Sequence, residues 1–377
     1  METLLNVPQG TFEIQRVPYR KNETLRAWDA ADEYLLQYLS ELESLAKESR
    51  VLILNDKFGA LVTALNQYKL VAISDSWLSQ HATRLNIEAN RVTERYIQLN
   101  STMNWPNQVF DLVLIKIPKT LALLEDQLIH LQAVITENTI IVAAGMVKAM
   151  SANVWKMLEK YIGPTKPSQA KKKARLIFVD IAADQQKLNN PYPVYYTLEK
   201  TAYRICNHAN VFSRASLDIG TRFLLEHLPK NTTANDIIDL GCGNGVVGLM
   251  LAESHPATLI HFVDESYMAV ASAKENFNHA YPNRKAKFYI TDGLTEFEAE
   301  MADLIICNPP FHQQNTVGDQ IALSMFKQSY RVLRPGGSLW VIGNRHLGYP
   351  INLKRLFSNY KEIAANKKFV IWQVNKL

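Results

Sequence analysis

The motif Asn308-Pro309-Pro310-Phe311 carries the most specific chemistry in this chain of 377 residues. The side-chain oxygen of Asn308 and the carbonyl oxygen of Pro309 are two acceptors, and proline has no backbone N–H to compete with them. Together they can hold both N–H groups of a planar amino group while its nitrogen becomes nucleophilic. Phe311 adds a flat ring on which a base can stack. The motif predicts alkylation of an exocyclic amino nitrogen by positioning and charge stabilisation, with no metal. The simpler alternative is a cis-proline loop without chemistry.

Glycines and acidic residues upstream of this motif predict a nucleotide-cofactor site. Gly241 and Gly243 form a tight turn at which the backbone can approach a ligand closely. Asp264 follows Gly243 by 21 residues and could hold both hydroxyls of a ribose. These features fit NAD as well as S-adenosylmethionine. Asp239, which could attract an ammonium group, and Asp292, which could accept from an adenine amino group, favour S-adenosylmethionine. The alternative for each acid alone is a helix cap or a solvated strand end.

The elements that must position these residues alternate between strands and helices. Apolar runs predict strands at 236–240, 258–266, 287–293, 302–311, 338–344 and 367–374. Helical spacing is found after the glycine turn and over 268–280 and 322–333, and Arg334-Pro335-Gly336-Gly337 is expected to form a turn. This alternation predicts a doubly wound α/β sheet, in which acids at successive strand ends share one crevice.

The same order of landmarks occurs earlier in the chain. The run from Val51 aligns with the run from Ile237, 186 residues later, and Asp75 aligns with Asp264, 189 residues later. Pro118 aligns with Pro310 at a spacing of 192, and 139–145 matches 338–344. Any two α/β domains share such runs, but here the special turns align too, which favours a duplication.

The first copy departs from the pattern at its chemical positions. Lys57 and Phe58 stand where the second copy has Gly243 and Asn244, and 116–119 reads Lys-Ile-Pro-Lys instead of the motif at 308–311. Bulky side chains should close the cofactor space, so the first copy is predicted to bind no cofactor and to grip RNA instead. We expect a degenerate domain over 1–185 with a lead-in helix in 27–46, a polar linker over 186–194 and a catalytic domain over 195–377.

The chain resembles the ribosomal RNA guanine-N2 methyltransferases. The resemblance rests on DLGCGNGVVG, VDES and NPPF in this order, on NHANVFSRASLDIGTRFLL at 207–225, and on IKIPKT and NKKFV, and it covers nearly the whole chain. It implies two tandem class I methyltransferase (Rossmann-like) domains, the first degenerate, and S-adenosylmethionine as cofactor. It implies catalysis by Asn308, Pro309, Pro310 and Phe311. The implied cofactor or base pocket comprises Asp239, Gly241, Gly243, Asn244, Asp264, Asp292, Phe212 and Asp218.

Within this family, the resemblance is to the branch that methylates 23S rRNA, and it implies an unpaired or flipped guanine as substrate. Alternatives are a 16S rRNA guanine-N2 methyltransferase and a non-catalytic RNA-binding or ribosome-assembly factor with a vestigial cofactor fold. The NPPF motif alone would also admit adenine-N6, cytosine-N4 or glutamine-N5 methyltransferases, which the duplicated architecture disfavours. An NAD-dependent oxidoreductase is disfavoured because no catalytic Tyr-Lys or His dyad stands at a fitting position.

Charge is unevenly distributed behind a formal net charge of only +5. Residues 148–175 hold eight basic residues and one acid, 327–377 hold ten and one, and 251–300 hold four and eight. Such basic stretches suit phosphate contacts, although solvated surface is the alternative. The residues expected to contact RNA are Lys166, Lys171, Lys172, Lys173, Arg175, Arg214, Lys367 and Lys368.

Composition excludes several other classes of protein. With 47% apolar residues the chain can bury real cores, and three scattered cysteines without a CxxC pair favour neither disulfides nor a structural zinc site. No metal is expected. The chain has neither a signal-peptide pattern nor a run of about 20 apolar residues. We expect a soluble cytoplasmic protein, and the internal pseudo-dimer favours a monomer.

Overall fold

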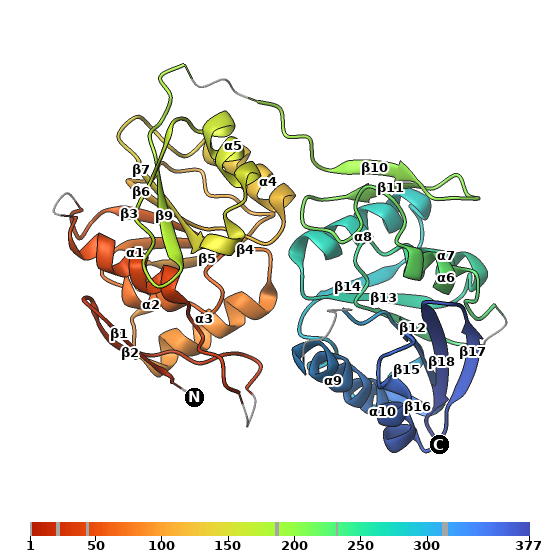
Figure 1. Ribbon diagram of the computed structural model, residues 1–377. Helices are drawn as coiled ribbons and strands as arrows, with labels where there is room; N and C mark the ends of the chain where they lie inside the picture. Colours follow the sequence, from red (N-terminus) through yellow and green to blue (C-terminus); the bar gives the residue numbers. More distant parts are fainter. Residues whose placement is uncertain (1, 20–22, 43–44, 185–187, 231–232, 311–315) are drawn as a thin grey trace. The chain divides into compact units, whose positions relative to one another are not determined.

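The computed structural model describes residues 2–19, 23–42, 45–184, 188–230, 233–310 and 316–377. The chain divides into two compact units, Met1–Tyr192 (unit 1) and Pro193–Leu377 (unit 2). Each unit carries a seven-stranded sheet covered by helices on both faces (Figure 1). Among the described residues, no helix combines the length and the apolar character needed to cross a membrane.

Unit 1 begins with an antiparallel hairpin and then folds around a sheet of order β5-β4-β3-β6-β7-β9-β8. Its strands are β1 (Leu4–Val7), β2 (Gly10–Glu13), β3 (Arg50–Leu54), β4 (Lys69–Ser74), β5 (Ile97–Ser101), β6 (Leu112–Lys116), β7 (Ile140–Met146), β8 (Thr165–Pro167) and β9 (Ala174–Val179). Its α-helices are α1 (Ala30–Ser40), α2 (Ala60–Ala64), α3 (Trp77–Ala89), α4 (Leu121–Leu131) and α5 (Ala152–Tyr161), with 3₁₀ turns at Glu94–Tyr96 and Val147–Ala149. Two apolar clusters form the core, one under α1 and α2 and the other under α4 and α5.

Unit 2 repeats this plan with a sheet of order β14-β13-β12-β15-β16-β18-β17. Its strands are β10 (Val194–Thr197), β11 (Arg204–Asn207), β12 (Asp236–Leu240), β13 (Leu259–Asp264), β14 (Ala286–Ile290), β15 (Ala302–Cys307), β16 (Leu333–Asn344), β17 (Lys361–Ala365) and β18 (Phe369–Asn375). Its helices are α6 (Ile219–Leu225), α7 (Val246–Ser254), α8 (Tyr267–Ala280), α9 (Thr316–Val332) and α10 (Tyr349–Phe357). Helices α6, α7 and α8 cover one face of the sheet, and α9 and α10 cover the other (Figure 1).

The central strands read as continuous apolar runs because both faces of the sheet are covered. In β12, Ile237, Ile238, Asp239 and Leu240 are all buried. This strand pairs in parallel with β13 on one side and β15 on the other. The carboxyl ends of β12, β13 and β15 therefore meet at one edge of the sheet, which is where the predicted chemistry lies.

The two units are copies at the level of register, as the shared strand order predicts. Arg50 pairs with Lys69 where Asp236 pairs with Leu259, so β3 and β12 correspond at a spacing of 186 residues and β4 and β13 at 190. Helices α3 and α8 both begin after a capping serine, Ser76 and Ser266, at the same spacing of 190. The α/β fold with two tandem Rossmann-like domains is confirmed.

Register corrects one alignment made from the sequence. Asp75 was expected to match Asp264 at a spacing of 189. The observed spacing of 190 instead puts Ser74 at the position of Asp264 and Asp75 at that of Glu265. A hydroxyl thus replaces the ribose-binding acid in unit 1. The sequence misled here because a single-residue slip still aligned an acid with an acid.

Most of the strands and helices predicted in unit 2 are present at the expected places, and two local predictions were wrong. Arg334-Pro335-Gly336-Gly337 is part of β16 rather than a turn, and its pairing with β15 shifts register at this point. Gly336 accommodates the irregularity with φ of +81°. The lead-in helix expected within 27–46 is the shorter α1, which ends at Ser40.

Candidate cofactor and amino-group site

The glycine turn after β12 leaves open space beside the backbone. Gly243 has φ of +53°, and a Cβ built there would meet nothing within 4 Å. A Cβ on Gly241 would approach the backbone oxygen of Asn308 at 3.3 Å. The turn therefore lies against the first residue of the NPPF motif and forms a cradle that a side chain would narrow.

Asp264 holds the open turn in place. One carboxylate oxygen accepts the N–H of Gly243 at 3.0 Å and the other accepts the N–H of Ser266 at 3.0 Å. It stands at the end of β13, where an acid can bind a ribose. Asp292 lies two residues beyond β14 rather than on the strand, and its backbone oxygen accepts from Thr295.

Asp239 is directed away from the turn's open side. It is 3% exposed and accepts the N–H of Gly248 in the first turn of α7 at 2.8 Å. Burial raises the pKa of this carboxyl from its ordinary value to about 7. In the structure it serves as a buried helix cap, the alternative that the sequence had left open for each acid.

Three further predicted pocket residues have different surroundings. Asn244 is buried and donates to Asn207 at 2.9 Å and to the hydroxyl of Tyr196 at 3.2 Å, which fastens the glycine turn to the hairpin β10–β11. Asp218 caps α6 by accepting the N–H of Thr221 at 2.9 Å. Phe212 is 72% exposed, so its ring is available to a ligand or partner.

Asn308 directly follows β15, and its amide makes one hydrogen bond within the described residues. Its Nδ2 donates to the hydroxyl of Thr221 at 3.3 Å, while its Oδ1 is buried without a described partner. Pro309 is buried and Pro310 is exposed. Phe311 lies outside the described residues. A buried acceptor without a partner costs free energy, about 1–3 kcal/mol, unless a ligand supplies the donor.

Two more unpartnered polar atoms lie along the same edge of the unit 2 sheet. The Thr291 hydroxyl follows β14, and the Asn344 side-chain oxygen ends β16; neither has a hydrogen-bond partner among the described residues. With Asn308 they mark the ends of three strands. The sequence did not single out Thr221, Thr291 or Asn344. Only Thr221 had a usable signal, because it follows the capping Asp218 by three residues.

The corresponding positions of unit 1 are filled. Lys116 corresponds to Asn308 at a spacing of 192, and its ammonium pairs with Asp29 at 2.8 Å and Asp32 at 2.6 Å. Burial alone would lower the pKa of Lys116, but the two carboxylates raise it. Thr102 corresponds to Thr291 and donates to Asp75 at 2.8 Å.

The glycine turn of unit 1 is also rebuilt. Asn55, with φ of +66°, replaces Gly241, and Asp56 replaces Cys242. Asp56 caps α2 by accepting the N–H of Val62 at 2.9 Å, the bond that Asp239 makes to Gly248 in unit 2. Phe58, at the position of Asn244, is buried in the core of unit 1.

The basic residues predicted to contact RNA are partly engaged within the protein. Lys166 pairs with Asp180 at 2.9 Å, and Lys172 pairs with Glu33 at 2.8 Å. Lys171 lies over the ring of Tyr34, with its ammonium 4.8 Å from the centroid. Lys173, Lys367 and Lys368 are exposed.

Two predicted RNA contacts fit less well. Arg175 lies on β9, half-buried, and its Nε is buried without a described partner. Arg214 is half-buried and donates to the carbonyl of Ala209 at 3.4 Å. Surface exposure, which the sequence does not report directly, separates these two from the lysines.

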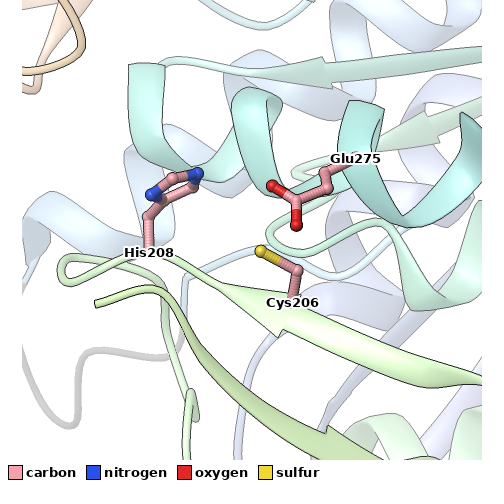
Figure 2. Close-up of side chains that lie close together, drawn as sticks. All are labelled: Cys206, His208 and Glu275. Atoms are coloured by element: carbon pink, nitrogen blue, oxygen red, sulfur yellow. The ribbon is translucent and has the colours of Figure 1, made fainter. Parts of the chain in front are cut away.

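A second polar cluster lies at the contact between β11 and α8 (Figure 2). Cys206, His208 and Glu275 bring their possible ligand atoms within 4.8 Å of one another. Burial and a hydrogen bond to Glu275 raise the pKa of the Cys206 thiol to about 12. A metal would need this thiol deprotonated, whereas at neutral pH it donates to Glu275. The three residues are far apart in sequence, so the cluster was not foreseen.

Comparison with known proteins places this geometry in a family. Residues 2–183 match the model of the RLMG N-terminal domain, and residues 202–373 match that of the methyltransferase small domain. A protein of Aeromonas salmonicida called ribosomal RNA large subunit methyltransferase G is 46% identical over 100% of both chains. The chain belongs to the ribosomal RNA large subunit methyltransferase G family.

Other members of the methyltransferase G family are similarly close. The protein of that name from Ectopseudomonas mendocina is 46% identical over 99% of this chain and 100% of its own, and the one from Streptomyces avermitilis is 43% identical over 100% of both. Among solved structures, a T. thermophilus 16S rRNA N2-guanine methyltransferase in complex with AdoMet and guanosine matches with a TM-score of 0.78. At 18% identity over 100% of this chain and 98% of that one, the match shows that the fold is shared.

Proposed function

We propose that this protein transfers a methyl group from S-adenosylmethionine to the exocyclic N2 of a guanine in 23S rRNA. The observation that carries the proposal is the buried, unpartnered Oδ1 of Asn308 beside an open glycine cradle. Membership of the methyltransferase G family supports the methyl-transfer chemistry and the large-subunit rRNA.

The residues of unit 2 fit S-adenosylmethionine. Gly241 and Gly243 leave backbone accessible, and Asp264 at the next strand end suits a ribose. Asp292 lies beyond β14, where it suits the adenine. When bound, S-adenosylmethionine supplies an electrophilic methyl group, which moves to the amino nitrogen as the carbon–sulfur electron pair stays on sulfur and the nitrogen gives up one proton.

Asn308 and Pro309 act on the amino group. The Oδ1 of Asn308 accepts one N–H and the carbonyl of Pro309 accepts the other, so that the nitrogen lone pair is directed away from both. These acceptors also stabilise the positive charge that develops on nitrogen. Phe311 stacks on the base. Since N2 of a paired guanine lies in the minor groove, the guanine must be unpaired or flipped to enter the site.

Unit 1 has a different task in this proposal. Its cofactor positions are occupied by Asn55, Asp56 and Phe58, and the Lys116 ammonium fills the place of the catalytic amide. It grips the RNA through basic surface that includes Lys171, Lys172 and Lys173. The active species is a monomer, because one chain supplies both the catalytic and the RNA-binding unit.

Two alternatives are disfavoured by particular observations. A 16S rRNA substrate is disfavoured because full-length relatives at 43% identity or more are named for the large subunit, whereas the 16S enzyme of the same fold is 18% identical. A vestigial RNA-binding factor is disfavoured because unit 2 keeps its cradle open while unit 1 has filled its own.

The test is methyl transfer to total RNA from a strain that lacks the gene. The protein is incubated with methyl-labelled S-adenosylmethionine, and the labelled nucleotide is mapped. We expect label at N2 of one guanine in 23S rRNA. Label in 16S rRNA, in adenine, in protein or in DNA would overturn the substrate assignment.

A further inference from the structure

The hydroxyl of Thr221 is poised between two groups of the unit 2 site. It lies 3.3 Å from a carboxylate oxygen of Asp218, to which it donates, and 3.3 Å from Nδ2 of Asn308, from which it accepts. The Thr221 residue is 8% exposed. Both distances are at the long end for hydrogen bonds, so the chain of bonds directs more than it stabilises.

The direction of this chain follows from what each group can donate. An ionised carboxylate only accepts, so the single proton of the Thr221 hydroxyl goes to Asp218. The oxygen of Thr221 then presents lone pairs to Asn308. A lone pair attracts the NH₂ end of an amide and repels the carbonyl end. The amide of Asn308 is therefore held with Nδ2 toward Thr221 and Oδ1 toward the space where an acceptor is needed.

Orientation matters because the two ends of an asparagine amide have nearly the same shape. Rotation by half a turn about the terminal bond would place NH₂ where Oδ1 now lies. That group would meet the N–H of a substrate amino group with a donor instead of an acceptor. Within unit 2, the described partner of the Asn308 amide is Thr221 alone, so this hydroxyl carries the orientation.

The degenerate unit holds the same three positions with inverted chemistry. Asp29, Asp32 and Lys116 correspond to Asp218, Thr221 and Asn308, and there the central residue pairs directly with the ammonium at 2.6 Å. Where the chemistry has been lost, an ion pair has replaced the hydroxyl relay. This contrast indicates that the relay belongs to the activity and not to the fold.

We propose that Thr221, oriented by Asp218, is a positioning residue that holds the Asn308 amide in its productive rotamer. The proposal rests on the proposed function, because it takes Asn308 as the acceptor for the amino group. Thr221 itself touches neither substrate nor cofactor. Its effect should appear in turnover and not in affinity.

Paired variants of Thr221 test this. Thr221→Val keeps the shape but removes the hydroxyl, and Thr221→Ser keeps the hydroxyl. For methylation of 23S rRNA we expect Thr221→Val to lower kcat about 10- to 100-fold, below the loss typical of a direct transition-state donor, with KM and cofactor affinity within about twofold. Thr221→Ser should retain kcat within about threefold. Equal kcat for both variants would overturn the proposal.

A readout that does not depend on activity separates this proposal from the function on which it rests. With ¹⁵N-labelled asparagine, the Asn308 NH₂ signals are assigned as those missing in Asn308→Asp. In Thr221→Val these signals should shift and exchange faster with solvent, while in Thr221→Ser they stay. Unmoved signals in Thr221→Val would refute the relay. A wild type that fails to methylate 23S rRNA would refute the function instead.

A reversal of polarity provides a sharper test of the direction of the bonds. Asn308→Asp places an oxygen against the lone pairs of Thr221 and should lose turnover. Asp218→Asn can donate to Thr221 and still cap α6, which frees the hydroxyl proton for residue 308. The double variant should therefore turn over at least threefold faster than Asn308→Asp alone. Losses that simply multiply would contradict the proposed direction.

Discussion

At the scale of single residues, unit 2 owes its chemistry to polar atoms that the fold leaves unsatisfied. Buried acceptors usually find donors within the protein. Asn308, Thr291 and Asn344 instead keep unpartnered atoms within the described structure, all at the carboxyl edge of one sheet. The stability given up there is available for recognition of a ligand that supplies the missing partners.

Removal of the Asn308 amide should separate binding from turnover. Asn308→Ala deletes the acceptor while leaving the glycine cradle and Asp264 in place. We expect cofactor affinity to change by less than about threefold and kcat to fall roughly 100- to 1000-fold, the loss found for one transition-state hydrogen bond. Calorimetry with S-adenosylmethionine and single-turnover methylation of rRNA measure the two quantities. Unchanged kcat would exclude the two-acceptor mechanism.

Asp239 should make the stability of unit 2 depend on pH. Its pKa is about 7 in the folded protein because it is buried, well above the ordinary value of 3.8 to which it returns on unfolding. The unfolded chain therefore releases this proton first, and stability falls as pH rises from about 4 to 7. Asp239→Asn, whose amide oxygen can still accept from Gly248, should lose about 2 kcal/mol less than wild type between pH 5 and 8.

The measurement for Asp239 is urea unfolding at the two pH values. Glu296→Gln serves as the control because it neutralises an exposed carboxylate of the same unit. The control should reproduce the wild-type loss of stability. If Asp239→Asn also does so, the buried carboxyl is not the source of the pH dependence.

At the scale of elements, the first helix after each hairpin decides what the sheet edge can do. In unit 2, α6 brings the hydroxyl of Thr221 to Asn308 and keeps its amide oriented. In unit 1, α1 brings Asp29 and Asp32 to Lys116 and locks the edge with charge. The two helices occupy matching places and differ in a few side chains, so activity was lost without loss of fold.

The ion pair of unit 1 should be structural. Lys116→Met keeps much of the side-chain volume but leaves the buried Asp32 without its counter-charge, which should destabilise unit 1 by about 3 kcal/mol. Lys119→Met is the control, since Lys119 is an exposed residue of the same segment. Denaturant unfolding followed by circular dichroism measures both. Equal stability of the two variants would show that the pair contributes little.

Much of the element pattern could be predicted from the sequence, and the reasons for the failures are physical. Apolar runs locate β12 and β15 because a strand buried on both faces has no polar positions. The register of Asp75 could not be found, because a shift of one residue leaves a strand's composition unchanged. The partners of Thr221 and Cys206 were also hidden, since they come from distant segments. Direction was missed at Asp239, whose carboxyl caps α7.

At the scale of the whole molecule, one fold serves two purposes in one chain. Unit 1 spends its conserved-looking edge on internal pairs and keeps exposed lysines in the turn between β8 and β9. Unit 2 keeps its edge open. The division explains why a nearly neutral chain can carry local positive charge where RNA would be gripped, away from the acidic stretch at 251–300.

Neutralising the lysine turn should weaken RNA binding in a salt-dependent way. For the triple variant Lys171→Ala, Lys172→Ala and Lys173→Ala, we expect the slope of log K against log salt to fall by about 2, because Lys172 is already partly paired with Glu33. Lys274→Ala with Lys287→Ala, exposed lysines within 251–300, should leave the slope unchanged. Filter binding to 23S rRNA fragments at several salt concentrations measures both; equal slopes would locate the RNA elsewhere.

The ion pair of Lys116 with Asp29 and Asp32 also has a consequence for stoichiometry. Although the chain contains two Rossmann-like folds, a titration with S-adenosylmethionine should saturate at one equivalent per chain, because an ammonium and two carboxylates already occupy the matching position in unit 1. An adenosyl analogue that reacts covalently should accordingly label peptides of residues 193–377 alone. The molecule thus contains its own unreactive reference site for any ligand aimed at the reactive one.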